Sequence, residues 1–113
     1  MPNASALAVA DPRLLAILQS LSDQNRLRIL EKLREGERCV CELQSTLGLA
    51  QPLLSHHLRT LREAGLVRDR RAGRWVHYSL VPEGLAELEA YVASVRSDAA
   101  AAATCSGTAG CAP

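Results

Sequence analysis

The sequence predicts a mainly α-helical fold with one β-hairpin, in the order α-α-α-α-β-β-α. Three observations lead to this fold class. Leucines recur at helical spacing over most of the 113 residues, whereas β-forming residues gather on both sides of the short segment RRAG at positions 70–73. In addition, the chain has no Phe, one Trp and two Tyr, so its core must be built from Leu, Val, Ile and Ala, which suits packed helices.

The first two predicted helices occupy segments 11–21 and 22–36. The first has Pro12 at a helix-start position and four leucines at helical spacing. The second has Asp23 as its expected N-cap and Gly36 at the position of a C-cap glycine. The residues expected to line its inward face are Leu27, Leu30 and Leu33.

A turn-linked pair of helices is predicted next. A helix of about two turns is closed by Gly48, and a second helix, 51–65, has Pro52 in its first turn and ends at Gly65. A turn of about four residues separates them, which is the pattern of a helix-turn-helix. The side chains expected to point inward from the second helix are those of Leu54, Leu58 and Leu61.

A hairpin and a last helix complete the predicted order. Segment 66–80 is predicted to form a hairpin with a basic tip, and Pro82 opens a helix that the alanine run 99–103 can prolong. A helix pair followed by a basic hairpin is the arrangement of a winged helix-turn-helix domain. The predicted organisation is a flexible N-terminus at 1–11, one winged domain at 12–98, and a flexible, cysteine-containing tail at 99–113.

Positive charge is concentrated in one part of the chain. The net charge is only +1, but residues 51–78 carry six arginines against Glu63 and Asp69, a local charge of +4. A basic segment on a nearly neutral chain is typical of a surface that binds nucleic acid. The alternative is a solvated basic surface.

The second helix of a helix-turn-helix enters the major groove with its N-terminal residues. Gln51 and Ser55 can hydrogen-bond base edges there, and Arg59 can reach a phosphate or a guanine. The hairpin arginines can reach the minor groove or its phosphates. His57 falls nearer the apolar stripe, which favours a structural role. The predicted DNA-binding set is Gln51, Pro52, Ser55, His56, Arg59, Arg62, Arg70, Arg71 and Arg74.

Other classes of protein are disfavoured. No apolar run approaches the ~18–20 residues of a membrane span, and no secretion signal is recognisable. We therefore expect a cytoplasmic protein without a membrane partner, whose four cysteines are reduced. The chain has no Gly-rich phosphate loop, and Glu83, Glu87 and Glu89 have the spacing of a solvated helix face, so we expect no enzymatic activity.

The chain contains the segments LSDQNRLRIL, ERCVCEL, LGLAQPLLSHHLRTLREAGLV and RRAGRWVHYSL. Together, over roughly residues 12–95, they resemble the ArsR/SmtB family of bacterial metalloregulatory repressors. The resemblance implies a homodimer that binds double-stranded operator DNA at an imperfect inverted repeat and is released by its inducer. It also implies that the first and last helices form the dimer interface, which would bury Leu14, Leu18, Leu85, Leu88, Val92 and Val95.

The paired cysteines Cys39 and Cys41 are similar to those of the family's arsenite and antimonite sensors, and cadmium and lead sensors share them. The resemblance therefore implies As(III) or Sb(III) as inducer, with Cd(II) or Pb(II) as the alternative, and no organic cofactor. Soft thiolates suit such soft ions. Side chains at i and i+2 diverge on an ideal helix, so binding by both cysteines requires a non-helical turn there. The alternative is that both are small packed hydrophobic residues.

The chain departs from the pattern of those sensors in its third ligand. Many arsenite sensors carry a third cysteine three residues after the pair, where this chain has Gln44. The remaining thiols are Cys105 and Cys111, and a tail extended from Ser97 would span up to ~50 Å, enough to reach the pair in its own or the partner subunit. One tail cysteine would complete three sulfurs for As(III), and both would make a four-thiolate site for Cd(II) or Pb(II).

The last helix lacks the Asp/His set with which zinc sensors of the family build their site, so we do not expect zinc to be the inducer. Ala50 stands where a Ser often caps the DNA-reading helix, a change that costs about 1 kcal/mol of helix stability. A thiol-redox or persulfide response, in which oxidation joins a cysteine near the helix pair to one near the C-terminus, remains an alternative.

Overall fold

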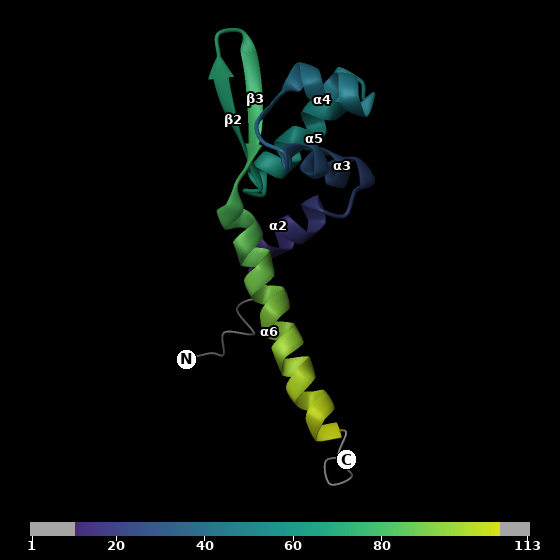
Figure 1. Ribbon diagram of the computed structural model, residues 1–113, viewed down its shortest axis with the longest axis vertical. Helices are drawn as coiled ribbons and strands as arrows, with labels where there is room; N and C mark the ends of the chain where they lie inside the picture. Colours follow the sequence, from purple (N-terminus) through teal and green to yellow (C-terminus); the bar gives the residue numbers. More distant parts are fainter. Residues whose placement is uncertain (1–10, 107–113) are drawn as a thin grey trace.

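The computed structural model describes residues 11–106, with the backbone alone for 104–106 (Figure 1). It confirms the predicted fold class, a mainly helical chain with a β-hairpin. The helices are α2 (Pro12–Ser20), α3 (Gln24–Leu33), α4 (Val40–Leu47), α5 (Gln51–Glu63) and α6 (Pro82–Ser106). The strands are β1 (Arg38–Cys39), β2 (Val67–Ala72) and β3 (Trp75–Leu80).

The strand β1 is an addition to the predicted order, which becomes α-α-β-α-α-β-β-α. It pairs antiparallel with β3, where Arg38 lies opposite Tyr78 and Cys39 opposite His77, so the strand order of the sheet is β1-β3-β2. The strands β2 and β3 form the predicted hairpin. A strand of two residues is too short to show an alternating pattern in the sequence, so its pairing with β3 alone identifies it.

Capping residues explain where the helices begin and end. Asp23 caps α3 as predicted, accepting hydrogen bonds from two backbone N–H groups of the first turn. Gly48 ends α4 in the left-handed conformation, with φ 67°. The sequence predicts the C-cap of α3 at Gly36, but the helix stops at Leu33 and its C-cap is Arg34, two residues earlier. Gly36, with φ 130°, instead turns the chain toward β1.

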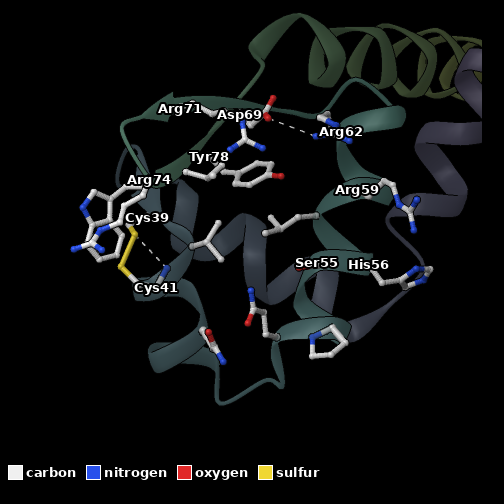
Figure 2. A pocket seen from close by; sticks show the side chains of 17 residues that line it. Cys39, Cys41, Ser55, His56, Arg59, Arg62, Asp69, Arg71, Arg74 and Tyr78 are labelled. Atoms are coloured by element: carbon white, nitrogen blue, oxygen red, sulfur yellow. Dashed lines mark hydrogen bonds and ion pairs between the residues drawn. A yellow bond between two sulfur atoms is a disulfide. The ribbon is translucent and has the colours of Figure 1, made fainter.

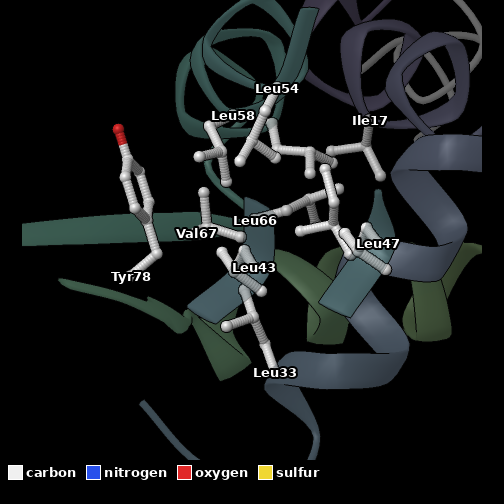
Figure 3. Close-up of a cluster of buried hydrophobic side chains, with 11 residues drawn as sticks. Ile17, Leu33, Leu43, Leu47, Leu54, Leu58, Leu66, Val67 and Tyr78 are labelled. Atoms are coloured by element: carbon white, nitrogen blue, oxygen red, sulfur yellow. The ribbon is translucent and has the colours of Figure 1, made fainter. Parts of the chain in front are cut away.

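The core lies among α2, α3, α4, α5 and the base of the hairpin (Figure 3). The buried stripe of α5 consists, as predicted, of Leu54, Leu58 and Leu61. For α3 the prediction was partly wrong, since Leu27 is 49% exposed and Ile29 is fully buried in its place. Positions 27 and 33 point about 120° apart on an α-helix and cannot share one face, whereas Ile29 and Leu33, at i and i+4, can.

The last helix, α6, contacts α2 near its start and then runs away from the domain (Figure 1). It continues to Ser106, so the alanine run prolongs the helix as expected, and residues 99–106, which were assigned to the flexible tail, are helical. Alanine has the highest helix propensity, which accounts for the extension. The predictions for segments 1–10 and 107–113 lie outside the described residues. None of the helices described is long and apolar enough to cross a membrane.

The start of α6 lies against the turn that follows α5 because Gly84 has no side chain. A methyl group at Gly84 would overlap the backbone carbonyl of Gly65. Three residues further along α6, Glu87 forms an ion pair with Arg13 of α2. The direction in which α6 leaves the domain therefore depends on a close backbone contact.

We predict that Gly84→Ala destabilises the fold by about 1–3 kcal/mol, because the added methyl group must displace backbone. In an unhindered helix the same change stabilises by about 0.5–1 kcal/mol, so the sign of the effect identifies the clash. Urea unfolding followed by circular dichroism measures it. Ala86→Gly, at an exposed position of the same helix, is the control and should lose only about 1 kcal/mol of helix propensity. A Gly84→Ala protein as stable as the parent would contradict the prediction.

Candidate nucleic-acid interface and cysteine pair

A groove of about 550 Å³ lies between α5, the start of α4 and one face of the hairpin (Figure 2). It brings together most of the predicted DNA-binding set and both cysteines of the C-V-C segment. From α5 it is lined by the residues that we call the reading face, namely Gln51, Pro52, Ser55, His56, Arg59 and Arg62. From the other elements it receives Arg71, Arg74, Cys39 and Cys41.

The reading face is exposed because the opposite side of α5 is buried. Its six residues are all exposed, whereas Leu54, Leu58 and Leu61 of the same helix are at most 1% exposed. The N-terminus of α5 has no side-chain cap, since Ala50 offers no acceptor, so its first N–H groups are available to an anion. This geometry fits a helix that presents its first turns to a DNA duplex.

The arginines of the hairpin, or wing, are divided between its two faces. Arg70 and Arg71 lie within β2 rather than at the tip, where Arg74 follows Gly73 in the turn. Neighbouring residues of a strand point to opposite faces. Arg71 therefore lines the groove, whereas Arg70 lies on the other face and donates two hydrogen bonds, of 2.8 and 2.9 Å, to the carboxylate of Glu37.

The pair between Glu37 and Arg70 stabilises the charged form of each side chain. The guanidinium lowers the pKa of Glu37, and the carboxylate raises the pKa of Arg70. Because the pair joins the residue before β1 to β2, it holds the wing to the segment that carries the cysteines. The structure thus does not bring Arg70 to the groove, in contrast to the set inferred from the sequence.

Within the groove, positive charge predominates beside aromatic rings. Arg62 forms an ion pair with Asp69 at 3.5 Å, and the Arg74 guanidinium lies 5.7 Å from the centre of the Trp75 ring. Burial raises the pKa of Tyr78, so its phenol is neutral at physiological pH. Trp75, which the sequence analysis treated only as a strand residue, is half exposed here. Two features of the sequence could have indicated that Trp75 lies at the candidate interface: it is the one Trp of the chain, and it directly follows the tip arginine Arg74.

The cysteine pair sits at the junction of β1 and α4. Cys39 is the N-cap of α4, with extended backbone angles (φ −69°, ψ 147°), and its Sγ accepts a hydrogen bond from the N–H of Cys41 at 3.2 Å. The side chain of Glu42 accepts from the N–H of Cys39 at 3.0 Å, which completes a capping box. Cys39 is therefore outside the helix, which meets the requirement for a non-helical turn at the pair.

The two cysteine side chains converge rather than diverge. Their Cα atoms are 5.2 Å apart, and the sulfurs are joined as a disulfide (Figure 2). Cys39 is buried and Cys41 is exposed, so the pair is reached from the groove. In the reduced state, the two sulfurs lie at the N-terminus of α4 in a groove that Arg71 and Arg74 also line. Two sulfurs so placed can bind a single soft ion.

Within residues 11–106, no third thiol lies beside the pair. Gln44, in place of the expected third cysteine, lines the same groove. Cys105 lies in the last turn of α6, and this end of the helix is remote from α4 (Figure 1). Residues 97–106 are helical, so they do not form the extended chain that was expected to carry Cys105 to the pair. Cys111 lies outside the described residues. Among those described, no cluster of three His, Cys, Asp or Glu residues is placed to hold a metal ion.

The residues expected at a dimer interface fall into three groups. Leu14 is buried within the protomer, and Leu85 and Leu88 are half-buried against its core. Leu18 of α2 and the α6 residues Val92 and Val95 are 41–51% exposed. A shallow groove of about 360 Å³ runs along α6 beside Leu85, Leu88 and Val92.

Residues 23–69 match the family model described as bacterial regulatory protein, arsR family. The chain is 53% identical over 68 residues to the arsenic resistance transcriptional regulator ArsR1 of Pseudomonas putida KT2440, covering 59% of this chain and 53% of that protein. It is 48% identical over 69 residues to the arsenical resistance operon repressor of Escherichia coli K12, covering 60% and 59%. The chain therefore spans between half and three fifths of the length of these two relatives.

Two further matches extend over more of their own length. The HTH-type transcriptional regulator NmtR of Mycobacterium tuberculosis H37Rv is 40% identical over 87 residues, which cover 77% of this chain and 72% of NmtR. A crystal structure described as a possible transcriptional regulator for arsenical resistance has 38% identity and a TM-score of 0.65, covering 70% of this chain and 82% of that one. These proteins are transcriptional regulators and not enzymes, and the chain belongs with them to the arsR family of bacterial regulatory proteins.

Proposed function

We propose that the chain is a homodimeric transcriptional repressor that leaves its operator when trivalent arsenic binds Cys39 and Cys41. One observation carries the proposal: both cysteines line the same groove as the reading face of α5 and the wing residue Arg71. A ligand on the two sulfurs therefore lies beside the surface that would contact DNA. The arsenic resistance regulators among the relatives support the choice of inducer.

The operator is double-stranded DNA with an imperfect inverted repeat, since a two-fold dimer presents two identical reading helices. In each half-site Gln51 and Ser55 hydrogen-bond base edges, and Arg59 contacts a phosphate or a guanine. The wing adds phosphate contacts from Arg71 and Arg74. Arg70, held by Glu37, contributes less.

Binding of the metalloid acts first on the start of α4. The sulfur of Cys39 caps this helix, and a sulfur bonded to arsenic is a weaker acceptor for the N–H of Cys41. Because Cys39 also pairs with His77 of β3, and Leu43 of α4 packs in the core with Leu58 of α5, a change at the cap reaches both the wing and the reading helix. A typical coupling of ~1–3 kcal/mol between inducer and DNA then favours release.

Trivalent arsenic takes three sulfurs, of which the pair supplies two. The third comes from a tail cysteine, Cys105 or Cys111. Because α6 carries Cys105 away from the groove of its own protomer, a contribution from Cys105 requires the partner subunit. Sb(III) shares this preference, whereas Cd(II) or Pb(II), the alternative inducers, would use four sulfurs. X-ray absorption of the loaded protein counts the sulfurs and separates these cases.

A second candidate is a thiol-redox repressor, with Cys39 and Cys41 as the oxidised pair instead of the expected pair that includes a C-terminal cysteine, and one observation favours it. Cys39 and Cys41 are joined as a disulfide in this structure, so their sulfurs can meet without rearrangement of the fold. In that case an oxidant removes two electrons and two protons from the thiol pair, and a reductant restores them. Reversible loss of DNA binding upon oxidation, with no response to metals, would identify this function.

We predict that Cys39→Ser and Cys41→Ser each retain operator binding and lose release by arsenite. Serine is a good N-cap, so Cys39→Ser keeps the start of α4 intact while removing a sulfur. The measurement is fluorescence anisotropy of the reduced protein on labelled DNA from upstream of its own gene, with arsenite, cadmium and zinc added near stoichiometric amounts. Cys105→Ser and Cys111→Ser, tested in the same way, identify the third ligand. Arsenite release of a folded Cys39→Ser protein, or its failure to bind DNA, would refute the assignment.

The two neighbouring wing arginines provide a matched test of the DNA surface. We predict that Arg71→Ala lowers the slope of log affinity against log salt concentration by about 0.9 per protomer, the value for one lost phosphate contact. Arg70→Ala, whose guanidinium is bound to Glu37, should change the slope much less. Titrations at several salt concentrations measure both slopes. Equal losses in the two variants would show that Arg70 leaves Glu37 to reach DNA.

We predict that Val92→Glu converts a dimer into a monomer and weakens operator binding, because it places a charge on the exposed apolar face of α6. Ala90→Glu, also at an exposed position of α6 but on the opposite side of the helix from that face, is the matched control and should leave the dimer intact. Sedimentation equilibrium gives the mass of each variant. A dimeric Val92→Glu protein would place the interface elsewhere.

A further inference from the structure

The reading helix α5 carries a second histidine that does not face the groove. His57 is 4% exposed and lies on the inner side of α5, whereas His56, its neighbour, is on the reading face. A buried imidazole in a helix whose inner stripe is otherwise leucine needs polar partners. Its surroundings are the end of α2 and the start of α3.

Arg26 of α3 connects His57 to α2. One guanidinium nitrogen, Nη1, lies 3.1 Å from Nδ1 of His57. The same side chain donates to the backbone carbonyls of Ser20 at 2.6 Å and Gln19 at 3.4 Å, both at the end of α2. Arg26 therefore ties the reading helix to the C-terminal end of α2, with the imidazole as the only member that can change its charge near neutral pH.

The contact with Arg26 determines which imidazole nitrogen carries the proton. A guanidinium only donates, so Nδ1 must accept, and the ring proton is on Nε2. Nε2 is buried without a hydrogen-bond partner, and the nearest carboxylate oxygen, Oδ1 of Asp23, is 3.9 Å away. That oxygen already accepts the N–H groups of Asn25 and Arg26 as the cap of α3. The structure therefore requires a neutral His57.

We propose that neutral His57 is a positioning residue for operator binding, and that its protonation releases α5 from Arg26 and lowers the affinity of the repressor for its operator. This inference rests on the proposed DNA-binding function. It adds a second input to the repressor, a proton taken up on the inner side of the reading helix rather than in the groove that holds the cysteine pair. Protonation would occur at Nδ1, so an N–H would face the guanidinium that now donates to this nitrogen.

The surroundings of the ring lower the pKa of His57 overall. Burial lowers the pKa of His57, Asp23 raises it, and Arg26 and His56 lower it further, with a net shift below the ordinary value of 6.5. The neutral ring thus contributes stability that is complete above pH 6.5 and is lost as the pH falls below that value. The end of α2 adds the carbonyls of Gln19 and Ser20, which hold Arg26 in place.

The chain has two other histidines, which serve as controls. His56 is on the reading face, and His77 of β3 lies opposite Cys39. A variant of each separates its contribution to the pH dependence from that of His57.

The test is operator affinity of the reduced full chain as a function of pH, at constant ionic strength, from about pH 8 down to the lowest pH at which the protein stays folded, by fluorescence anisotropy. The pKa of His57 in the folded chain lies below the ordinary 6.5, so we expect the affinity to be constant above pH 6.5 and to fall as the pH drops through that lower pKa, by at most about tenfold per pH unit for each protomer. In His57→Asn the amide oxygen takes the place of Nδ1 and does not titrate, so the affinity at pH 8 should be kept and the acid loss abolished. In His56→Gln and in His77→Gln the acid loss should remain.

A second variant, Arg26→Gln, tests the same inference if His57→Asn does not fold. Arg26→Gln keeps a donor for Nδ1 but removes the positive charge that opposes protonation, so the midpoint of the acid loss should move to higher pH. Circular dichroism at each pH checks that the protein is folded. An affinity that does not change with pH, an unchanged acid loss in His57→Asn, or a loss that coincides with unfolding would overturn the inference. Absence of DNA binding already at pH 8 would instead overturn the proposed function itself.

Discussion

The burial of one leucine stripe of α5 is the interaction on which the candidate interface depends. Leu54, Leu58 and Leu61 are at most 1% exposed, and burying each such side chain stabilises the fold by about 1.5–3 kcal/mol. Residues on the opposite side of the helix, such as Ser55 and Arg59, must then face the groove. A rotation of α5 about its axis would bury arginine and expose leucine, so the core sets the orientation of the surface that we propose reads DNA.

The polar contacts between helices supplement this apolar constraint. Arg26 joins the end of α2 to His57 on the inner side of α5, and Glu37 joins Arg70 of the wing to the segment before β1. Neither contact lies in the groove, yet each positions an element that lines it. The apolar stripe fixes which way α5 faces in all conditions, whereas the contact with His57 depends on a proton.

Cys39 is where the sheet, the helix pair and the groove meet. It is the last residue of β1, paired with β3, and also the N-cap of α4, held in a capping box with Glu42. A ligand on its sulfur therefore disturbs a strand and a helix at once. An extended residue followed by a helical one turns the two sulfurs toward each other, which is the geometry that the proposed inducer site needs.

The helices, the hairpin and the exposed face of α5 could be predicted from the sequence, because periodic leucines, caps such as Asp23 and breakers such as Gly48 act over a few residues. The strand β1, the partner of Arg70 and the partner of His57 could be identified only in the folded chain. The two side-chain contacts join residues that are 31 or more positions apart, and β1 has two residues. Such pairings leave no periodic trace in the sequence, since they depend on how the packed helices bring distant residues together.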